Sequence, residues 1–174
     1  MDSASLVFLD ECSVNIGMTR LYGRAFGEDR VIDYVPDVRF DRLSLLSSMR
    51  LDGTLVPLAY KGTLDGSFFL TYITQCLAPT LRVGDIVIMD NASPHKVKGV
   101  VEAIEAMGAF VLYLPTYSPD LNPVEYMWSK IKSYLRSVKA RTFDALFDAL
   151  KHALNLVSIS DISGGFSMTN YSVL

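Results

Sequence analysis

The sequence predicts an α/β protein: a mixed β-sheet, antiparallel in its first strands and then parallel, with helices on both faces. Three observations predict this class. Short apolar runs recur along the chain, a hairpin pattern separates the first run from the second, and helical patterns alternate with the later runs. Half of the 174 residues are hydrophobic and 20% are charged, which excludes a disordered chain and provides for one buried core.

Apolar runs at residues 6–9, 86–89 and 110–114 are typical of central strands. Each run is short, continuous and rich in β-branched or aromatic side chains. We therefore expect all three strands to be covered on both faces of the sheet.

The segment between the first two runs predicts a β-hairpin. Residues 42–51 and 54–62 flank Asp52-Gly53, a strong turn dipeptide. Residues 12–38 are interrupted by glycines and a proline, and they predict either a short strand or only a loop.

Four stretches have the apolar spacing of amphipathic helices. Asp65 can cap the first and Gly108 ends the second. From Ser158 onward there is no periodicity, so we expect one domain over residues 1–157 and a loosely structured tail over 158–174. The four stripes consist of Phe68, Phe69, Tyr72, Ile73, Cys76 and Leu77; Val97, Val100, Val101, Ile104 and Met107; Val124, Trp128, Ile131 and Leu135; and Phe143, Leu146, Phe147, Leu150 and Leu154.

Composition excludes several classes of protein. No apolar run is long enough to span a membrane, and the acidic N-terminus does not resemble a signal peptide, so a cytoplasmic location is expected. Cys12 and Cys76 form no zinc or disulfide pattern and predict reduced thiols. The net charge of −3 argues against a dedicated nucleic-acid-binding module, but it is compatible with an enzyme whose site is built of carboxylates.

Three acidic residues can converge at one edge of the predicted sheet. Asp10 ends the first apolar run and Asp90 the second, so the two lie side by side if their strands are neighbours. Asn122 is a good N-cap and Pro123 suits the first helical position, which places Glu125 in the first turn of a helix after the third run. Hard divalent cations prefer such oxygen ligands, and a pair of them supports displacement at phosphorus.

Each of these acids also has an ordinary structural interpretation. An aspartate at the end of a strand often only forms a turn. The spacing from Asn122 to Glu125 resembles a capping box, in which the glutamate bonds back to the cap. The combination and its spacing favour a functional cluster.

The three acids resemble the acidic triad of the DDE transposases. Asp10 stands in "FLDE", Asp90 in "IMDNASPHK" and Glu125 in "LPTYSPDLNPVEYMWSKIK". The 34 residues between Asp90 and Glu125, together with "YSPDLNPVE", are characteristic of the mariner-like superfamily and the related bacterial insertion-sequence transposases. The resemblance covers residues 5–155.

The resemblance implies a fold, a reaction and a set of partners. It implies a ribonuclease-H-like fold and two Mg²⁺ or Mn²⁺ ions held by the triad. The reaction is cleavage of DNA at transposon ends, after which the freed 3′-hydroxyl attacks target DNA at a TA dinucleotide. It further implies inverted-repeat ends and target DNA as partners, a dimer assembled on DNA, and association with the bacterial nucleoid when active.

This sequence departs from the pattern in one respect. Relatives carry an N-terminal helix-turn-helix region that recognises the inverted repeats, and this chain starts one strand before Asp10. We therefore expect an isolated catalytic domain, or half of a split reading frame whose upstream half is a DNA-binding partner chain.

Residues around the triad have two interpretations each. Asn91 can hold a carboxylate or a water, or cap a turn, and His95 can contact a phosphate or pack in a loop. Tyr117 and Ser118 are candidates for the DNA backbone. By strand alternation Glu11 points away from Asp10. Trp128 is expected as a core anchor and His152 at the surface.

Basic residues are concentrated after Glu125. Residues 126–142 contain five basic side chains and no acid, and with two further lysines they form either a surface that follows DNA phosphates or a solvated helix face. They are Lys130, Lys132, Arg136, Lys139 and Arg141, with Lys96 and Lys98.

Two other functions remain open from the sequence. One is another ribonuclease-H-like nuclease, which would hydrolyse DNA without strand transfer. The other is a non-catalytic regulatory or remnant fragment of a transposase.

Overall fold

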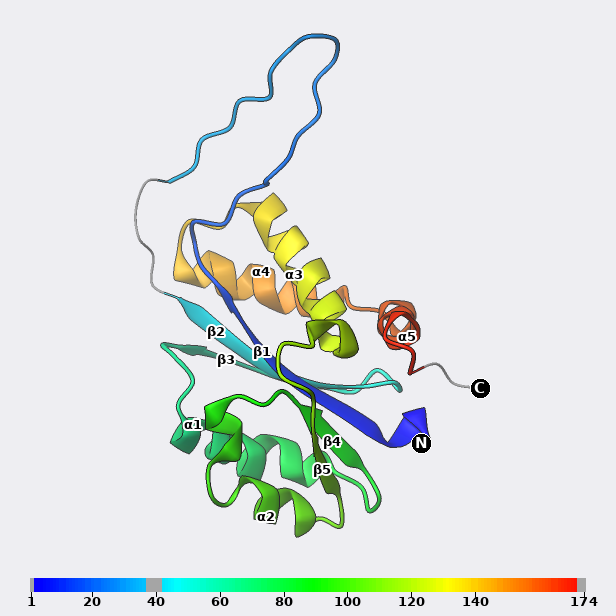
Figure 1. Ribbon diagram of the computed structural model, residues 1–174. Coiled ribbons are helices and arrows are strands. Elements are labelled where there is room, and N and C mark those ends of the chain that lie inside the picture. Colours follow the sequence, from blue (N-terminus) through cyan, green and yellow to red (C-terminus); the bar gives the residue numbers. More distant parts are fainter. Residues whose placement is uncertain (1, 37–41, 172–174) are drawn as a thin grey trace.

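A computed structural model describes residues 2–36 and 42–171. Within these residues one five-stranded sheet has the order β3-β2-β1-β4-β5 (Figure 1). β1 pairs with β2 and β2 with β3 in antiparallel fashion, whereas β1–β4 and β4–β5 are parallel, so the predicted mixed sheet is confirmed. The strands are β1 (Leu6–Val14), β2 (Leu43–Arg50), β3 (Leu55–Lys61), β4 (Ile86–Met89) and β5 (Phe110–Tyr113).

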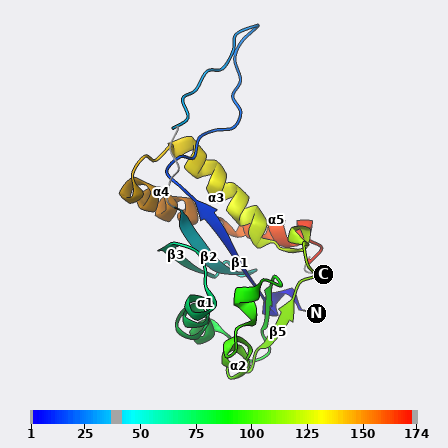
Figure 2. The ribbon, with the colours of Figure 1, turned by 60° about the vertical axis from the view of Figure 1, so that its left-hand side comes forward.

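The predicted hairpin is the β2–β3 pair. Gly53 has a positive φ of 93°, which a glycine adopts without strain, and the Asp52 carboxylate accepts a hydrogen bond from the Thr54 backbone at 2.9 Å. β1 extends to Val14, and residues 15–36 form a long loop that projects from the body of the molecule (Figures 1 and 2). Residues 37 and 38 of the ambiguous segment lie outside the described part.

The four predicted helices are present on two faces of the sheet. α1 begins after Asp65, whose carboxylate accepts a hydrogen bond from the Phe68 backbone at 2.8 Å. α1 and α2 cover one face, and α3, α4 and a fifth helix cover the other (Figures 1 and 2). The helices are α1 (Gly66–Tyr72), α2 (Val100–Glu105), α3 (Val124–Val138), α4 (Phe143–Asn155) and α5 (Ile159–Met168), with short turns η1 (Ser3–Ser5), η2 (Ile73–Leu77), η3 (Ala78–Thr80), η4 (Ser93–Lys96) and η5 (Pro119–Leu121).

The expectation of a loosely structured tail over residues 158–174 is wrong for most of that segment, because α5 occupies Ile159–Met168. α5 begins at a capping box of Ser158 and Asp161 and buries Ile162 and Phe166, one turn apart. A Cβ on Gly165 would lie 3.2 Å from the Pro123 carbonyl oxygen, so the glycine allows α5 to approach the start of α3. Gly165, one of the residues that hid the helical pattern, is thus part of its packing.

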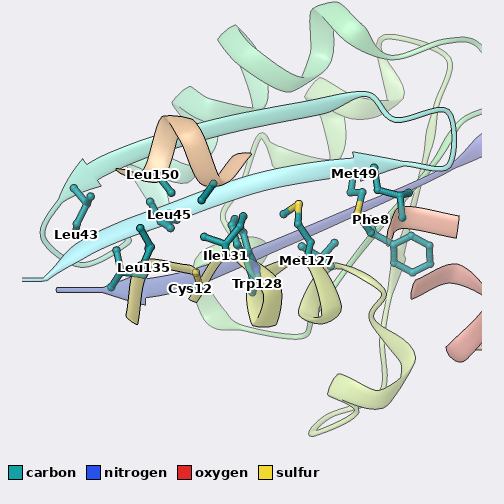
Figure 3. Packing of buried hydrophobic residues seen from close by; sticks show 14 of the residues in the cluster. Phe8, Cys12, Leu43, Leu45, Met49, Met127, Trp128, Ile131, Leu135 and Leu150 are labelled. Atoms are coloured by element: carbon teal, nitrogen blue, oxygen red, sulfur yellow. The ribbon is translucent and has the colours of Figure 1, made fainter. Parts of the chain in front are cut away.

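Each face of the sheet carries a separate hydrophobic core. Alternate β1 residues Leu6, Phe8 and Cys12 pack toward α3, α4 and α5 (Figure 3), while Val7 and Leu9 pack toward α1 and α2. This alternation directs the side chain of Asp10 to the α3 face.

β5 differs from the predicted central strand. It lies at the edge of the described sheet, and Phe110 and Leu112 are 61% and 43% exposed. Because α3 packs over β1, no helix of that face covers these two side chains in the described structure.

Among residues 2–36 and 42–171, no helix combines the length and apolarity needed to cross a membrane.

Candidate active site

Asp10 and Asp90 lie on neighbouring strands, as the sequence suggested. β1 and β4 are parallel and their pairing ends at Phe8 with Ile88, a register that places Asp10 level with Asp90. Asp10 is not at the end of its strand, however, because β1 continues beside β2 to Val14. The predicted strand end is therefore that of β4 alone, and Asp10 lies where its parallel neighbour has stopped.

α3 brings Glu125 to the same place. The Asn122 side chain accepts a hydrogen bond from the Val124 backbone at 3.2 Å, and the helix begins at Val124, one residue later than predicted. The Asn122 N–H donates to the Pro119 carbonyl at 3.0 Å and not to the Glu125 carboxylate, so the capping-box alternative is not observed. α3 packs on β1, which directs Glu125 toward Asp10.

All three carboxylates line one pocket of about 320 Å³. The pocket also contains Asn91 and the loop after β5, including Tyr117 and Ser118. Tyr117 is fully exposed and has a positive φ of 58°, while Ser118 is half-buried. Side chains from β1, the end of β4 and the start of α3, 115 residues apart at the extremes of the triad, thus face a common space.

Burial and like charge dominate the chemistry of Asp10. Its side chain is 8% exposed. Burial, then the charge of Glu125 and more weakly that of Asp90, raise its pKa to about 7, and the indole N–H of Trp128, which donates to Asp10 Oδ2 at 3.1 Å, only partly opposes this. Near neutral pH, Asp10 therefore exchanges its proton readily.

Asp90 is in the opposite situation. Its side chain is 53% exposed. Its Oδ1 lies 2.6 Å from His95 Nδ1 and accepts a hydrogen bond from the Ala92 backbone at 3.1 Å. The hydrogen bond with His95 outweighs partial burial and lowers the pKa of Asp90, so this carboxylate stays charged.

His95 contacts Asp90 rather than the pocket. It is 2% exposed, its ring lies on that of Phe69 with centroids 4.4 Å apart, and the Tyr113 hydroxyl donates to its carbonyl at 3.1 Å. Burial lowers the pKa of His95, but the hydrogen bond and charge of Asp90 prevail and raise it overall. The His95 ring does not line the pocket. Of the two interpretations that the sequence left open, packing in the loop is the one observed, and contact with a phosphate stays a prediction.

Trp128 has a role that the sequence reasoning missed. It is a buried core anchor, as expected, at 1% exposure, and it is also the hydrogen-bond donor to Asp10. Its position three residues after Glu125 was the available signal, because that spacing puts both side chains on neighbouring parts of one helix. Glu11 and His152 are both exposed, in agreement with expectation.

The basic residues do not form one continuous surface. Lys132 and Arg136 follow Glu125 at seven and eleven residues, a spacing that keeps them on its side of α3. Lys130 instead pairs with Asp161 at 2.5 Å. Lys96 and Lys98 are exposed in and after η4, which packs against α1 and α2 on the other face of the sheet.

Two more basic residues are engaged with the long loop. Lys139 pairs with Asp33, and the Arg141 guanidinium donates to the carbonyl oxygens of Ile16 and Met18 at 2.8 and 3.1 Å.

The cysteines are free thiols, and burial raises the pKa of Cys12 to about 12, so that thiol is unreactive.

The donor set fits a hard divalent cation. Every candidate ligand is a carboxylate or amide oxygen, the kind that Mg²⁺ and Mn²⁺ prefer. Positive charge between the acids would relieve the repulsion that raises the pKa of Asp10. Within the described residues no group of three His, Cys, Asp or Glu side chains is arranged to hold one ion, so the fit rests on the oxygen donors that line the pocket.

Comparison with known proteins identifies relatives of this architecture. Residues 5–147 match the family model of the DDE superfamily endonucleases. The Tcb2 transposase of the transposable element in Caenorhabditis briggsae is 32% identical over 73 residues, which are 42% of this chain and 27% of that protein. The chain therefore spans well under two thirds of this curated relative.

Solved structures share the fold at low sequence identity. The Mos1 transposase paired-end complex with left transposon end has a TM-score of 0.79 and 16% identity, covering 97% of this chain and 53% of that one. The mariner Mos1 paired end complex with Mg has a TM-score of 0.75 and 16% identity, covering 95% and 52%. The predicted ribonuclease-H-like fold is confirmed by these similarities.

Proposed function

The chain belongs to the DDE superfamily endonucleases, and on that premise we propose that it is the catalytic domain of a DNA transposase. Its reaction is divalent-metal-dependent cleavage of DNA at transposon ends, followed by attack of the freed 3′-hydroxyl on target DNA. The observation that carries this proposal is the pocket in which Asp10, Asp90 and Glu125 meet.

The three carboxylates would hold two Mg²⁺ or Mn²⁺ ions. Bound ions of this kind activate the attacking oxygen and stabilise the leaving oxygen of an in-line displacement at phosphorus. Asp90 contributes a permanent negative charge, since its pKa is lowered. Asp10 contributes one that appears as its proton leaves near neutral pH. Asn91 and Ser118, which line the pocket, can orient the phosphate by hydrogen bonds.

The side of α3 that carries Glu125 would follow the DNA backbone. Lys132 and Arg136 lie along that side and can neutralise phosphates beyond the reacting one. Lys130 forms an ion pair with Asp161 and is less available for DNA. Lys96 and Lys98 would contact DNA only from the other face of the sheet. Tyr117, exposed at the rim of the pocket, completes this set.

The proposal includes the assembly that transposition requires. Joining two transposon ends needs two active sites, so we expect a dimer on DNA. A separate DNA-binding region, in a partner chain or a longer form of this protein, would recognise the inverted repeats. The cytoplasm, next to the chromosome, is the expected location.

Nicking of supercoiled plasmid tests the chemistry. We expect wild-type protein to nick DNA in Mg²⁺ or Mn²⁺ and to join a pre-cut 3′-hydroxyl end to target DNA. Asp10→Asn, Asp90→Asn and Glu125→Gln should each reduce nicking on the order of 10³-fold or more, because each removes a metal ligand.

Glu11→Gln is the matched control. Glu11 is adjacent to Asp10 on β1 but lies outside the pocket, so its variant should retain activity. Full nicking by Asp90→Asn would overturn the assignment. Nicking without strand transfer would favour a plain nuclease.

A further inference from the structure

Each aspartate of the site has a hydrogen-bond contact with a buried side-chain nitrogen that does not line the pocket. For Asp10 this is the indole nitrogen of Trp128, and for Asp90 it is Nδ1 of His95. The two donors come from opposite faces of the sheet: Trp128 belongs to the core beneath α3, and His95 lies on Phe69 of α1. Neither donor lines the pocket.

The contact of Trp128 links two of the acids. Trp128 Nε1 donates to Oδ2 of Asp10 at 3.1 Å, and Glu125 stands three residues earlier on the same helix. Because Trp128 is 1% exposed and packed in the core, its ring cannot rotate freely. The position of Asp10 is therefore tied to that of the helix that carries Glu125.

The contact of His95 restrains Asp90 in a different way. His95 Nδ1 reaches both Oδ1 and the backbone oxygen of Asp90, at 2.6 and 3.2 Å. Stacking on Phe69 and the Tyr113 hydroxyl bond hold the imidazole itself. The Ala92 backbone also donates to Oδ1, so both contacts of the Asp90 carboxylate use the same oxygen, and Asp90 lines the pocket.

We propose, building on the proposed function, that Trp128 and His95 are positioning residues that set the orientation and separation of the two aspartate carboxylates for divalent-metal binding. A carboxylate rotates easily about its terminal torsion, which has broad preferences. A donor behind one oxygen limits that rotation and directs the other oxygen forward. Partners of this kind behind metal ligands are typically worth about 10–100-fold in metal affinity or activity.

Calorimetric titration of the metal-free chain with Mn²⁺ tests the proposal directly. Trp128→Phe keeps most of the ring but removes the donor, and His95→Leu removes the imidazole. We expect each variant to bind Mn²⁺ about 10–100-fold more weakly. His95→Asn should recover most of that loss, because its amide nitrogen can donate from nearly the position of Nδ1.

Two control variants separate positioning from general stability. Ile131→Val shortens a buried side chain on the same helix as Trp128, and Tyr72→Phe removes a buried hydroxyl that donates to the Val56 carbonyl at 2.7 Å, away from the acids. Both should lower the unfolding temperature while leaving Mn²⁺ affinity within about twofold of wild type, since neither touches a carboxylate.

Tryptophan fluorescence gives a second readout that does not depend on catalysis. Trp128 is the only tryptophan in the chain, and its indole contacts Asp10. Mn²⁺ should change its emission in the wild type and in His95→Asn, and should leave it unchanged in Asp10→Asn.

The outcomes distinguish this proposal from the one it rests on. If Trp128→Phe and His95→Leu bind Mn²⁺ as tightly as wild type while Asp90→Asn does not, the positioning role is wrong and the metal site stands. If Asp90→Asn binds Mn²⁺ like wild type, or wild type does not bind it, both proposals are overturned. Equal losses in Ile131→Val and Trp128→Phe would also reject positioning.

Discussion

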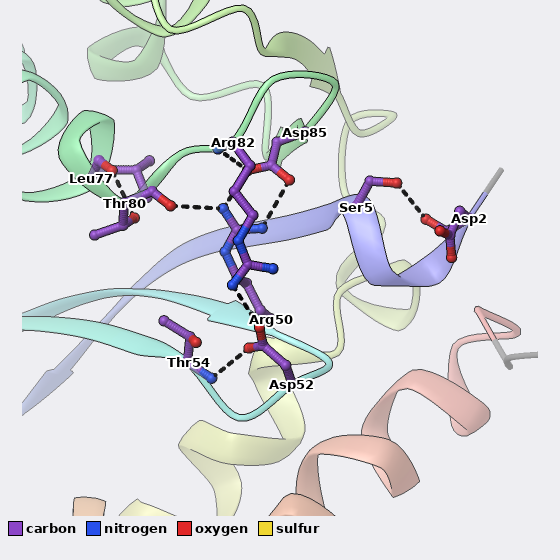
Figure 4. Close-up of polar contacts among 9 residues, drawn as sticks. All are labelled: Asp2, Ser5, Arg50, Asp52, Thr54, Leu77, Thr80, Arg82 and Asp85. Carbon is purple, nitrogen blue, oxygen red and sulfur yellow. Dashed lines mark hydrogen bonds and ion pairs between the residues drawn. The ribbon is translucent and has the colours of Figure 1, made fainter.

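Asp85 and Asp10 are two buried carboxylates near opposite ends of β4, at 3% and 8% exposure, and their surroundings differ. Asp85 forms a buried ion pair with Arg50, whose Nη1 donates to Oδ1 at 2.9 Å, and it accepts a further bond from the Arg82 backbone at 2.6 Å (Figure 4). Arg50 in turn donates to the Thr80 carbonyl at 3.2 Å. Asp10 has the indole of Trp128 and, nearby, two more negative charges.

The difference shows which end of the sheet is structural. At Asp85 burial alone would raise the pKa, but the hydrogen bonds and charges of Arg50 and Arg82 together outweigh it and the pKa is lowered. At Asp10 nothing comparable opposes burial and the neighbouring acids, and the pKa rises to about 7. The chain supplies its own cation at one end and concentrates negative charge at the other, as an exogenous cation requires.

Removal of Arg50 disrupts the buried ion pair with Asp85 and should have the largest effect on stability. Arg50→Met leaves the Asp85 charge buried and unpaired, so we expect the free energy of unfolding to fall by about 3–5 kcal/mol, measured by urea denaturation. The double variant Arg50→Met/Asp85→Leu should recover much of the loss because no charge remains. A loss below about 1 kcal/mol, as for an exposed pair, would contradict this account.

Removal of the Asp10 charge should raise the free energy of unfolding, the opposite of the effect of removing Arg50. The folded-state pKa of about 7 exceeds the unfolded value, so the folded protein binds the extra proton, and its stability falls as pH rises from about 4 to 7. In EDTA, Asp10→Asn should therefore be more stable than wild type at pH 8, by up to about 4 kcal/mol, with the gap closing toward pH 4.

Asp85→Asn is the matched variant for that experiment. The pKa of Asp85 is lowered, so its stabilisation is present at neutral pH and is lost only as pH falls below the ordinary aspartate range. Denaturation across pH should show Asp85→Asn less stable than wild type at pH 8. The comparison fails if both variants shift stability in the same direction.

Addition of Mg²⁺ should stabilise the folded protein through the site of Asp10, Asp90 and Glu125, and not through the Arg50–Asp85 pair. At 100 times the dissociation constant the gain is about 2.7 kcal/mol, visible as a rise in unfolding temperature. The gain should shrink below pH 7, where the proton on Asp10 competes with the ion. Arg50→Met should respond like wild type, and an equal response from Asp90→Asn would place the ion elsewhere.

Neutralising Glu125 should have the smallest effect. Its charge is the second cause of the raised pKa of Asp10, after burial, so Glu125→Gln should lower that pKa only part of the way toward its ordinary value. The pH dependence of stability in EDTA reports the shift. Asp120→Asn, an exposed acid outside the pocket, should leave the curve unchanged.

Local patterns predicted most of the fold. The apolar runs, the Asp52-Gly53 turn and the cap at Asp65 depend on a few neighbouring residues, and all were found where expected. The prediction failed for α5, whose helical pattern rests on Ile162 and Phe166 and whose glycine allows a neighbouring helix to approach. It also failed for the exposure of β5, which depends on the strand order and not on the strand.

The sequence by itself determined which acids could meet, because the apolar runs, the helix start and the 34-residue spacing are local features. That Asp10 and Asp90 lie side by side depended on the pairing of β1 with β4. Only the tertiary structure decided how each acid behaves: Asp10 lies within β1 against Trp128, 118 residues away, and Asp90 rests on a buried His95. Burial and contacts between distant residues determine a pKa, and no local pattern of residues records them.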